Sequence, residues 1–261
     1  MLKSQGQSLH KALILIIMFI MVLPIVATLL YSLSTTWGAT ILPDGYTLNW
    51  FITLLKDPRF LAAFGRSAIV CLSSMVLCIV LLLPVIFIVF YALPQLKKFF
   101  NFIVILPFAV PPVVSSVGLI QLYSDDPLPL SGTAWILICT YFTIVIPFVY
   151  RSIANSFASI ALHDLIDAAK LLGASTFKAF MLTVLPNLKK GLLSAIFISL
   201  SVLLGEFVFA NILVGTRYET LQIYLFNMRQ KSGHFTSALV ITYFAVVFIF
   251  TYFAGRVGNK K

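Results

Sequence analysis

Residues 67–93, which read SAIVCLSSMVLCIVLLLPVIFIVFYAL, contain no charged side chain and indicate the class of fold. A helix that crosses a bilayer needs about 20 mostly apolar residues, because the hydrocarbon core is about 30 Å thick. Backbone groups in lipid must be satisfied within the chain, and such runs are too long for barrel strands. We therefore expect an all-α membrane protein with six transmembrane helices. The predicted spans are residues 12–33, 67–93, 99–123, 133–150, 191–215 and 235–255.

The overall composition leads to the same conclusion. The 261 residues are 61% hydrophobic and only 10% charged, with a mean hydropathy of +1.05. Soluble domains carry about 25% charged residues, so this chain has too little polar surface for a water-soluble globule. The first apolar run, after Lys3 and Lys11, is longer than the core of a signal peptide, and we interpret it as a retained helix. We expect one transmembrane domain over residues 1–261.

The net charge of +10 is explained by orientation in a membrane. The basic residues lie in short loops and form no patch with interleaved aromatic residues, which argues against nucleic-acid binding. If the loops alternate across the membrane, 12 of the 18 Lys and Arg residues share the side of the N-terminus, Lys260 and Lys261 among them. The positive-inside rule then predicts that both termini are cytoplasmic.

Prolines interrupt the third predicted span. Pro107, Pro111 and Pro112 each lack the N–H that a helix interior requires, and each can kink its helix. We expect a break between residues 107 and 112, buried against neighbouring helices or lining a cavity.

The long connection between the fourth and fifth spans, residues 151–190, predicts a pair of short cytoplasmic helices. It is too apolar for a solvated linker and too interrupted for another span. Gly173 suits the left-handed position that ends a helix, Ser175 or Thr176 can cap the next one, and Pro186 stops it. Helical spacing places five side chains on one face of the first helix: Leu162, Leu165, Ile166, Ala169 and Leu172.

Within this connection, residues 167–186 read DAAKLLGASTFKAFMLTVLP and resemble the EAA motif, EAA-x3-G-x9-I-x-LP. The motif characterises the permeases of binding-protein-dependent ABC importers, of the type I fold. Asp167 replaces the motif glutamate and Thr183 its isoleucine. Five positions match in register: Ala168, Ala169, Gly173, Leu185 and Pro186.

The resemblance implies that the helix pair fits a cleft on a separate ATPase subunit and transmits its closure to the membrane helices. Asp167 is one methylene shorter than glutamate, so two roles stay open: an ion pair across the cleft, or capping and solvation of its own helix. The implied coupling positions are Asp167, Ala168, Ala169, Lys170, Gly173, Ala174, Leu185 and Pro186.

The resemblance also implies partners and a location. The sequence contains no G-x-x-x-x-G-K-[ST] loop, so we expect a transport subunit that is not an enzyme and binds no cofactor, with ATP-Mg on two partner ATPase chains. A second permease, either a related chain or a second copy, and an extracytoplasmic solute-binding protein would complete the assembly. The location implied is the bacterial cytoplasmic (inner) membrane.

Glu206 is the one ionisable residue inside a predicted span. A charge at that depth is costly and should face the bundle interior or a wet cavity. It is a candidate wall of the translocation path, and the alternative is a structural hydrogen bond to a neighbouring helix or subunit. No metal site is expected, because Cys71, Cys78 and Cys139 lie in apolar runs without a C-x-x-C or a nearby His pair.

Residues 35–60, TTWGATILPDGYTLNWFITLLKDPRF, resemble the second permease of polyamine, 2-aminoethylphosphonate and ferric-iron importers. We expect a polyamine such as spermidine or putrescine as substrate first, and 2-aminoethylphosphonate second. The alternative function is an ion-coupled secondary transporter or a channel subunit, which would call for several ionisable groups within the membrane or for internal repeats.

Overall fold

A computed structural model describes the backbone of residues 2–259 and the side chains of residues 10–253, 255 and 256. Lys260 and Lys261, which entered the orientation count, lie outside the described residues. The described chain is helical, and its one β-bridge joins Ser34 to Tyr46, which confirms the expected all-α class. The helices are α1 Leu2–Leu33, α2 Asn49–Lys56, α3 Pro58–Tyr91, α4 Lys97–Ile103, α5 Pro112–Tyr123, α6 Ala134–Ala158, α7 Leu162–Leu171, α8 Thr176–Ala179, α9 Leu185–Asn187, α10 Lys189–Leu204, α11 Val208–Leu213, α12 Leu221–Met228 and α13 Gly233–Asn259.

Within the described chain, four helical segments are long and apolar enough to cross a membrane by themselves. They are His10–Leu33, Pro58–Tyr91, Ala134–Ala158 and Gly233–Phe253. Two bent helix pairs also qualify if each pair is counted as one span, which gives up to six. The number of spans therefore depends on how the two bent pairs are counted.

The predicted break in the third span is confirmed. The helical segments Pro94–Phe108 and Pro112–Tyr123 meet at an angle of 87°. Pro111 has an extended ψ of 139°, and Pro112 begins α5 at a position where its missing N–H costs nothing.

The predicted fifth span, residues 191–215, is wrong in its second half. α10 ends at Leu204, and a separate helix, α11, begins at Val208. The other bent pair lies before this point, where Thr176–Asn187 and Lys189–Leu204 meet at 67°. Hydropathy did not reveal the break at residues 205–207, because the residues on both sides of it are equally apolar.

The chain divides into two compact units, which we describe separately. The first comprises Met1–Leu61 and Leu225–Val246, and the second comprises Ala62–Tyr224 and Val247–Lys261. The single domain expected from the sequence stays a prediction.

In the first unit, the His234 side chain joins the end of α1 to α2 and to the start of α13. Its ring stacks on Tyr31 at 4.1 Å between centroids and on Trp50 at 5.8 Å. Its Nδ1 lies 2.9 Å from both the Tyr31 carbonyl oxygen and the Ser34 hydroxyl.

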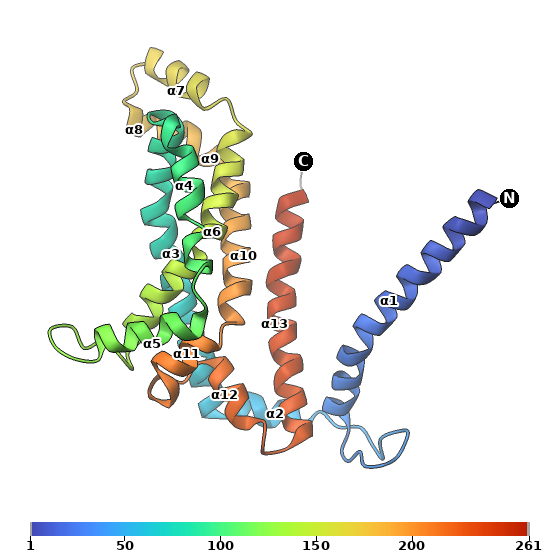
Figure 1. Cartoon of the computed structure of the whole chain (residues 1–261). Helices are drawn as coiled ribbons and strands as arrows, with labels where there is room; N and C mark the ends of the chain where they lie inside the picture. Colours follow the sequence, from blue (N-terminus) through green and yellow to red (C-terminus); the bar gives the residue numbers. More distant parts are fainter. Residues whose placement is uncertain (1, 260–261) are drawn as a thin grey trace. The chain divides into compact units, whose positions relative to one another are not determined.

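In the second unit, α3, α6 and α10 carry the core. Buried side chains of α6 such as Leu137, Val149 and Ile153 lie at its centre. The Ser74 hydroxyl of α3 donates to the Ile138 carbonyl of α6 at 3.1 Å. Figure 1 shows α7 and α8 at one end of this unit and α5 and α11 at the other.

The close approach of α6 and α10 depends on Gly191. A Cβ built at Gly191 would clash with the Ser156 side chain and would lie 2.9 Å from the Ser152 carbonyl oxygen. Small residues of this kind let helix backbones approach closely in membrane bundles.

We predict opposite effects for the same substitution at two glycines. Gly191→Ala should lower the free energy of unfolding by about 1–3 kcal/mol, because the backbone of α6 must shift. Gly65→Ala is the matched control: a Cβ there meets nothing within 4 Å, so it should be neutral or stabilise α3 by about 0.5–1 kcal/mol. Thermal unfolding in detergent measures both, and equal melting temperatures would contradict the proposed packing.

Candidate functional site

The first helix of the predicted pair, α7, presents most of the expected face to the protein. Leu162, Ile166 and Ala169 are buried, and Leu165 is half-buried. Leu172 was wrongly placed on this face, since it is 89% exposed. It occupies the C-cap of α7, where the chain has already left the helical path.

The turn after α7 has the conformation predicted for it. Gly173 has φ of +83°, the left-handed region that favours glycine. Its N–H donates to the Lys170 carbonyl at 2.8 Å, and the Ala174 N–H donates to the Ala169 carbonyl at 3.1 Å. These two bonds form a Schellman motif, which satisfies carbonyls at the end of the helix.

The second helix of the pair is irregular. The Ser175 hydroxyl accepts from the Lys178 N–H at 3.3 Å, which confirms Ser175 as the cap of α8. A π-helical turn, Phe180–Val184, follows, and Leu185 and Pro186 begin α9 just before the bend into α10. Thr183, which replaces the motif isoleucine, donates its hydroxyl to the Ala179 carbonyl one turn back.

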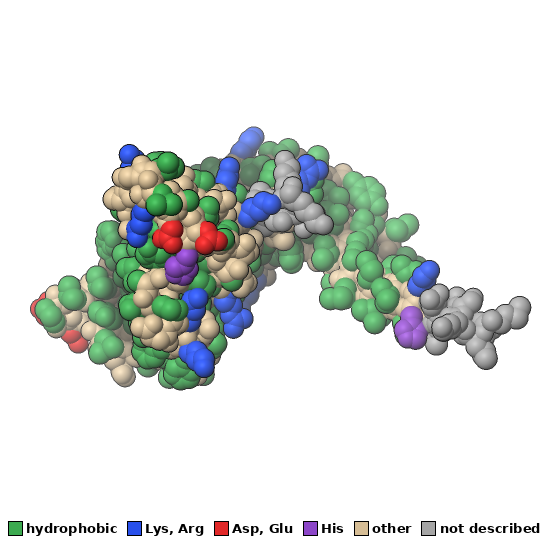
Figure 2. Space-filling view, turned by 90° about the horizontal axis from the view of Figure 1, so that it is seen from above, with side chains coloured by type: hydrophobic (Ala, Val, Ile, Leu, Met, Phe, Trp, Pro, Cys, Tyr) green, Lys and Arg blue, Asp and Glu red, His purple; other side chains and the backbone are tan. Residues whose placement is uncertain are grey.

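The other side of α7 and the adjoining turn are exposed. Asp167, Ala168 and Lys170 are exposed, as the coupling role requires. Leu171 is 90% exposed and Phe177 is 74% exposed, and with Leu172 they form an apolar tip. Figure 2 looks onto this end of the second unit and shows basic side chains around a small acidic group.

Among the positions expected to couple to the ATPase, Lys170 makes the most specific contact. Its ammonium donates to the Tyr91 hydroxyl at 2.8 Å. This hydrogen bond, together with the nearby Asp167 carboxylate, raises the pKa of Lys170. Tyr91 was not among the predicted site residues, because nothing in its local sequence signals a contact to a helix so far along the chain.

Glu206 lies at the break between α10 and α11, not inside a helix as expected. Its Oε1 accepts from the Phe209 N–H at 2.8 Å, and its Oε2 accepts from the Ala210 N–H at 3.1 Å. The Tyr141 hydroxyl of α6 donates to the same Oε2 at 2.9 Å. The carboxylate thus caps the N-terminus of α11, the end of a helix that favours negative charge. Through Tyr141 it also connects α11 to α6.

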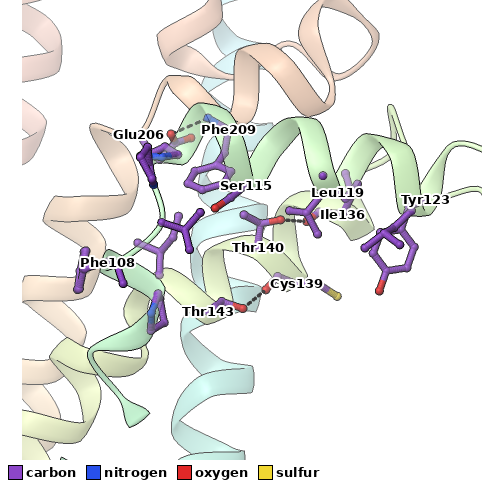
Figure 3. Close-up of a pocket in the computed structure, with 18 of the residues that line it drawn as sticks. Phe108, Ser115, Leu119, Tyr123, Ile136, Cys139, Thr140, Thr143, Glu206 and Phe209 are labelled. Atoms are coloured by element: carbon purple, nitrogen blue, oxygen red, sulfur yellow. Dashed lines mark hydrogen bonds between the residues drawn. The ribbon is translucent and has the colours of Figure 1, made fainter. Parts of the chain in front are cut away.

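Glu206 also lines a cavity of about 740 Å³ between α5, α6 and α11. In Figure 3, Glu206 and Phe209 lie at one end of the residues drawn and Tyr123 at another, with the α6 side chains between them. Most of the lining is apolar. The hydroxyls of Thr140 and Thr143 donate to carbonyls of their own helix, so they are already satisfied. No Lys, Arg or His is among the lining residues.

The described residues offer no metal site. They contain no group of three or more His, Cys, Asp or Glu side chains that could hold a metal ion. Cys71 and Cys78 are buried free thiols in α3, and Cys139 is an exposed one in α6.

We predict that Glu206 stabilises the α10–α11 junction through both carboxylate oxygens. Glu206→Gln leaves one amide N–H without an acceptor and should cost about 1–3 kcal/mol. Tyr141→Phe removes a single hydrogen bond and should cost about 1 kcal/mol. Thermal unfolding in detergent tests the order of the two effects, and a Gln variant as stable as the wild type would contradict the capping role.

The chain resembles known transport proteins over most of its length. One relative is the permease PhnV of Salmonella typhimurium strain LT2, which is named for 2-aminoethylphosphonate transport. The two chains are 27% identical over 211 residues, which cover 81% of this chain and 78% of that relative. This chain is also 31% identical over 163 residues to the sulfate transport system permease CysW of Escherichia coli K12, covering 56% of this chain and 55% of that relative.

A solved structure shares the fold. It is a bacterial ABC transporter involved in the import of the acidic polysaccharide alginate, and one of its chains matches with a TM-score of 0.76 at 15% sequence identity. The match covers 97% of this chain and 96% of that one. Residues 86–260, more than half of the chain, match the family described as the binding-protein-dependent transport system inner membrane component. The chain therefore belongs to this family: it is a permease subunit of a type I ABC importer, a multi-pass membrane protein of the inner membrane.

Proposed function

We propose that this permease forms the translocation path for an amino-phosphonate, 2-aminoethylphosphonate or a close analogue, and that α7 and α8 couple it to ATP hydrolysis. Members of the family are transport subunits that work with ATPase chains, a binding protein and a second permease. In this proposal two ATPase chains hold ATP-Mg, and this polypeptide binds no nucleotide. Membership of the family also sets aside the alternative of an ion-coupled transporter or channel.

The coupling role is supported by the two-sided character of α7. Its buried face holds the helix on the second unit through Leu162 and Ile166, while Asp167, Ala168 and the apolar tip stay exposed. An exposed apolar tip with charged neighbours is typical of a protein–protein contact, where apolar residues form the centre and charges the rim. We propose an ATPase subunit as the occupant.

The topology in this proposal has six spans: the four single helices, the bent pair of Pro94–Phe108 and Pro112–Tyr123, and Lys189–Leu204 of the other pair, whose Thr176–Asn187 limb stays at the cytoplasmic face. An even number of crossings places both termini on the same side, and the distribution of Lys and Arg assigns that side to the cytoplasm. The helix pair α7–α8 then faces the cytoplasm, where ATP is available.

The turn at Gly173 provides a direct test of coupling. Gly173→Asp should leave the protein in the membrane but abolish the stimulation of ATP hydrolysis by the binding protein, because it adds a negative charge at the contact. Gly173→Asn is the matched control: asparagine tolerates a positive φ and adds no charge, so it should retain most of the stimulation. ATPase assays of the copurified complex measure this, and normal stimulation with Gly173→Asp would contradict the coupling role.

The substrate proposal rests on two observations. The 2-aminoethylphosphonate relative matches over 81% of this chain, and the sulfate relative over 56%. The cavity also contributes, because its one ionisable acidic group is Glu206 and no basic side chain lines it. An acidic group favours the ammonium end of an amino-phosphonate, whereas sulfate has no cationic group that could pair with it.

Polyamine, the substrate expected first from residues 35–60, is not supported by the relatives reported above. None of them is named for polyamine transport. A relative that matches most of the chain is named for transport of 2-aminoethylphosphonate, the substrate expected second. Both substrates carry an ammonium group, so the cavity alone does not separate them.

Calorimetry on the copurified binding protein is the decisive measurement for the substrate. We predict that the binding protein binds 2-aminoethylphosphonate, with sulfate and spermidine each at least 100-fold weaker. Tight binding of spermidine or of sulfate, with no heat from 2-aminoethylphosphonate, would contradict the substrate proposal while leaving the permease role intact.

A further inference from the structure

Tyr91 is the last residue of α3, and two residues of α7 contact it. The Lys170 ammonium donates to the Tyr91 hydroxyl at 2.8 Å, and His163 Nε2 lies 3.3 Å from the Tyr91 carbonyl oxygen. His163 and Lys170 are seven residues apart, two turns of helix, so they share one face of α7. The backbone carbonyl and the side-chain hydroxyl of Tyr91 therefore contact α7 at positions two turns apart.

The contact with His163 uses a backbone carbonyl at the end of α3. The last carbonyls of α3 have no partner within the helix, and a cation near them is favourable. His163 donates to the Tyr91 carbonyl in the tautomer that carries its hydrogen on Nε2. Lys170 has only donors, so the Tyr91 oxygen accepts from it, and the ammonium also lies 5.3 Å from the centre of the Tyr91 ring.

On its other side, Tyr91 belongs to an aromatic cluster that joins three elements. Its ring is stacked on Phe87 with 5.5 Å between centroids and an angle of 4°. Phe87 in turn contacts Phe180 of the π-helical turn at 4.5 Å and Phe157 of α6 at 6.4 Å. A displacement of α7 at Lys170 therefore meets a continuous set of contacts leading into α3, α6 and the segment before α10.

Polar contacts at Tyr91 differ from the rest of the α7 interface. Leu162, Ile166 and Ala169 pack through apolar surfaces, which are non-directional. A hydrogen bond is directional and weakens steeply as its angle opens. The bonds at Tyr91 are thus the contacts by which α7 determines the position of the end of α3.

We propose that Tyr91 is a positioning residue for coupling, which passes the movement of α7 to α3 through its hydrogen bond with Lys170. The proposal rests on the proposed coupling role of α7. It gives Lys170 an inward role, toward α3, while its neighbours Asp167 and Ala168 face the ATPase.

The first experiment uses the full chain alone in lipid nanodiscs. Tyr91→Phe keeps the ring and removes only the hydroxyl, and Lys170→Met removes the donor. Each should raise hydrogen exchange in residues 162–171, and the double variant should raise it no further, because both changes delete the same bond. Lys178→Met, an exposed lysine of α8, is the matched control and should change nothing in α7. Wild-type exchange in both single variants would overturn the proposal.

The second experiment measures coupling in the copurified transporter in lipid vesicles. Tyr91→Phe should assemble normally and keep the basal ATPase rate, but the stimulation of ATP hydrolysis by the purified binding protein should fall several-fold. Lys170→Met should lower the stimulation by a similar factor, measured relative to its own basal rate. The two effects should not add. Raised exchange in α7 with unchanged stimulation would make Tyr91 a purely structural contact and would overturn the proposal, as would additive losses.

The two experiments also separate this inference from the function on which it rests. If the wild-type chain assembles with the ATPase but Tyr91→Phe is fully stimulated, only the role of Tyr91 is contradicted. If the wild-type complex shows no stimulation at all, or the chain copurifies with no ATPase, the coupling function fails and the role of Tyr91 fails with it.

Discussion

The need to satisfy every backbone N–H and C=O within the protein constrains this structure more than any other interaction. In hydrocarbon no water replaces a missing partner, so the long apolar runs become helices, and a break is tolerated only where another group supplies the lost hydrogen bonds. α3, Pro58–Tyr91, and α6, Ala134–Ala158, continue as single helices in spite of Pro84 and Pro147. The break at residues 205–207 has an identifiable replacement for its hydrogen bonds.

At the break between α10 and α11, side chains provide both a donor and acceptors for backbone groups that lack a helical partner. The Glu206 carboxylate accepts from the first N–H groups of α11, and the Gln222 side chain donates to the Leu204 carbonyl at the end of α10. The other break, at residues 107–112, lies beside the same cavity. At these two breaks the irregular backbone lines a cavity. Glu206, which accepts the hydrogen bonds at one of them, is also the acidic group of the cavity.

The α7–α8 pair combines two requirements that normally exclude each other. In the proposed coupling role it must be attached firmly to the membrane helices, and it must leave a surface free for an ATPase subunit. Helical spacing separates the two: Ile166 and Ala169 face inward, while Asp167, Ala168 and Leu171 face outward. The left-handed Gly173 then reverses the chain sharply enough for Phe177 to join the same exposed tip. A rigid attachment with a free outer face is what transmission of force between subunits requires.

Much of this protein was determined by local sequence. The apolar runs specified the helices, the prolines between residues 107 and 112 specified the bend, and the Gly173–Ser175 turn specified the shape of the helix pair, because each depends on backbone chemistry within a few residues. Local sequence failed where a long-range partner decided the outcome. It placed Glu206 inside a helix, and it did not identify Tyr91. Leu172 was wrongly placed on the buried face for a local reason, because it is the C-cap of α7 beside the left-handed Gly173. The Tyr141 hydroxyl beside Glu206 and the Lys170 ammonium on Tyr91 are 65 and 79 residues away along the chain, so only the tertiary structure brought these groups together.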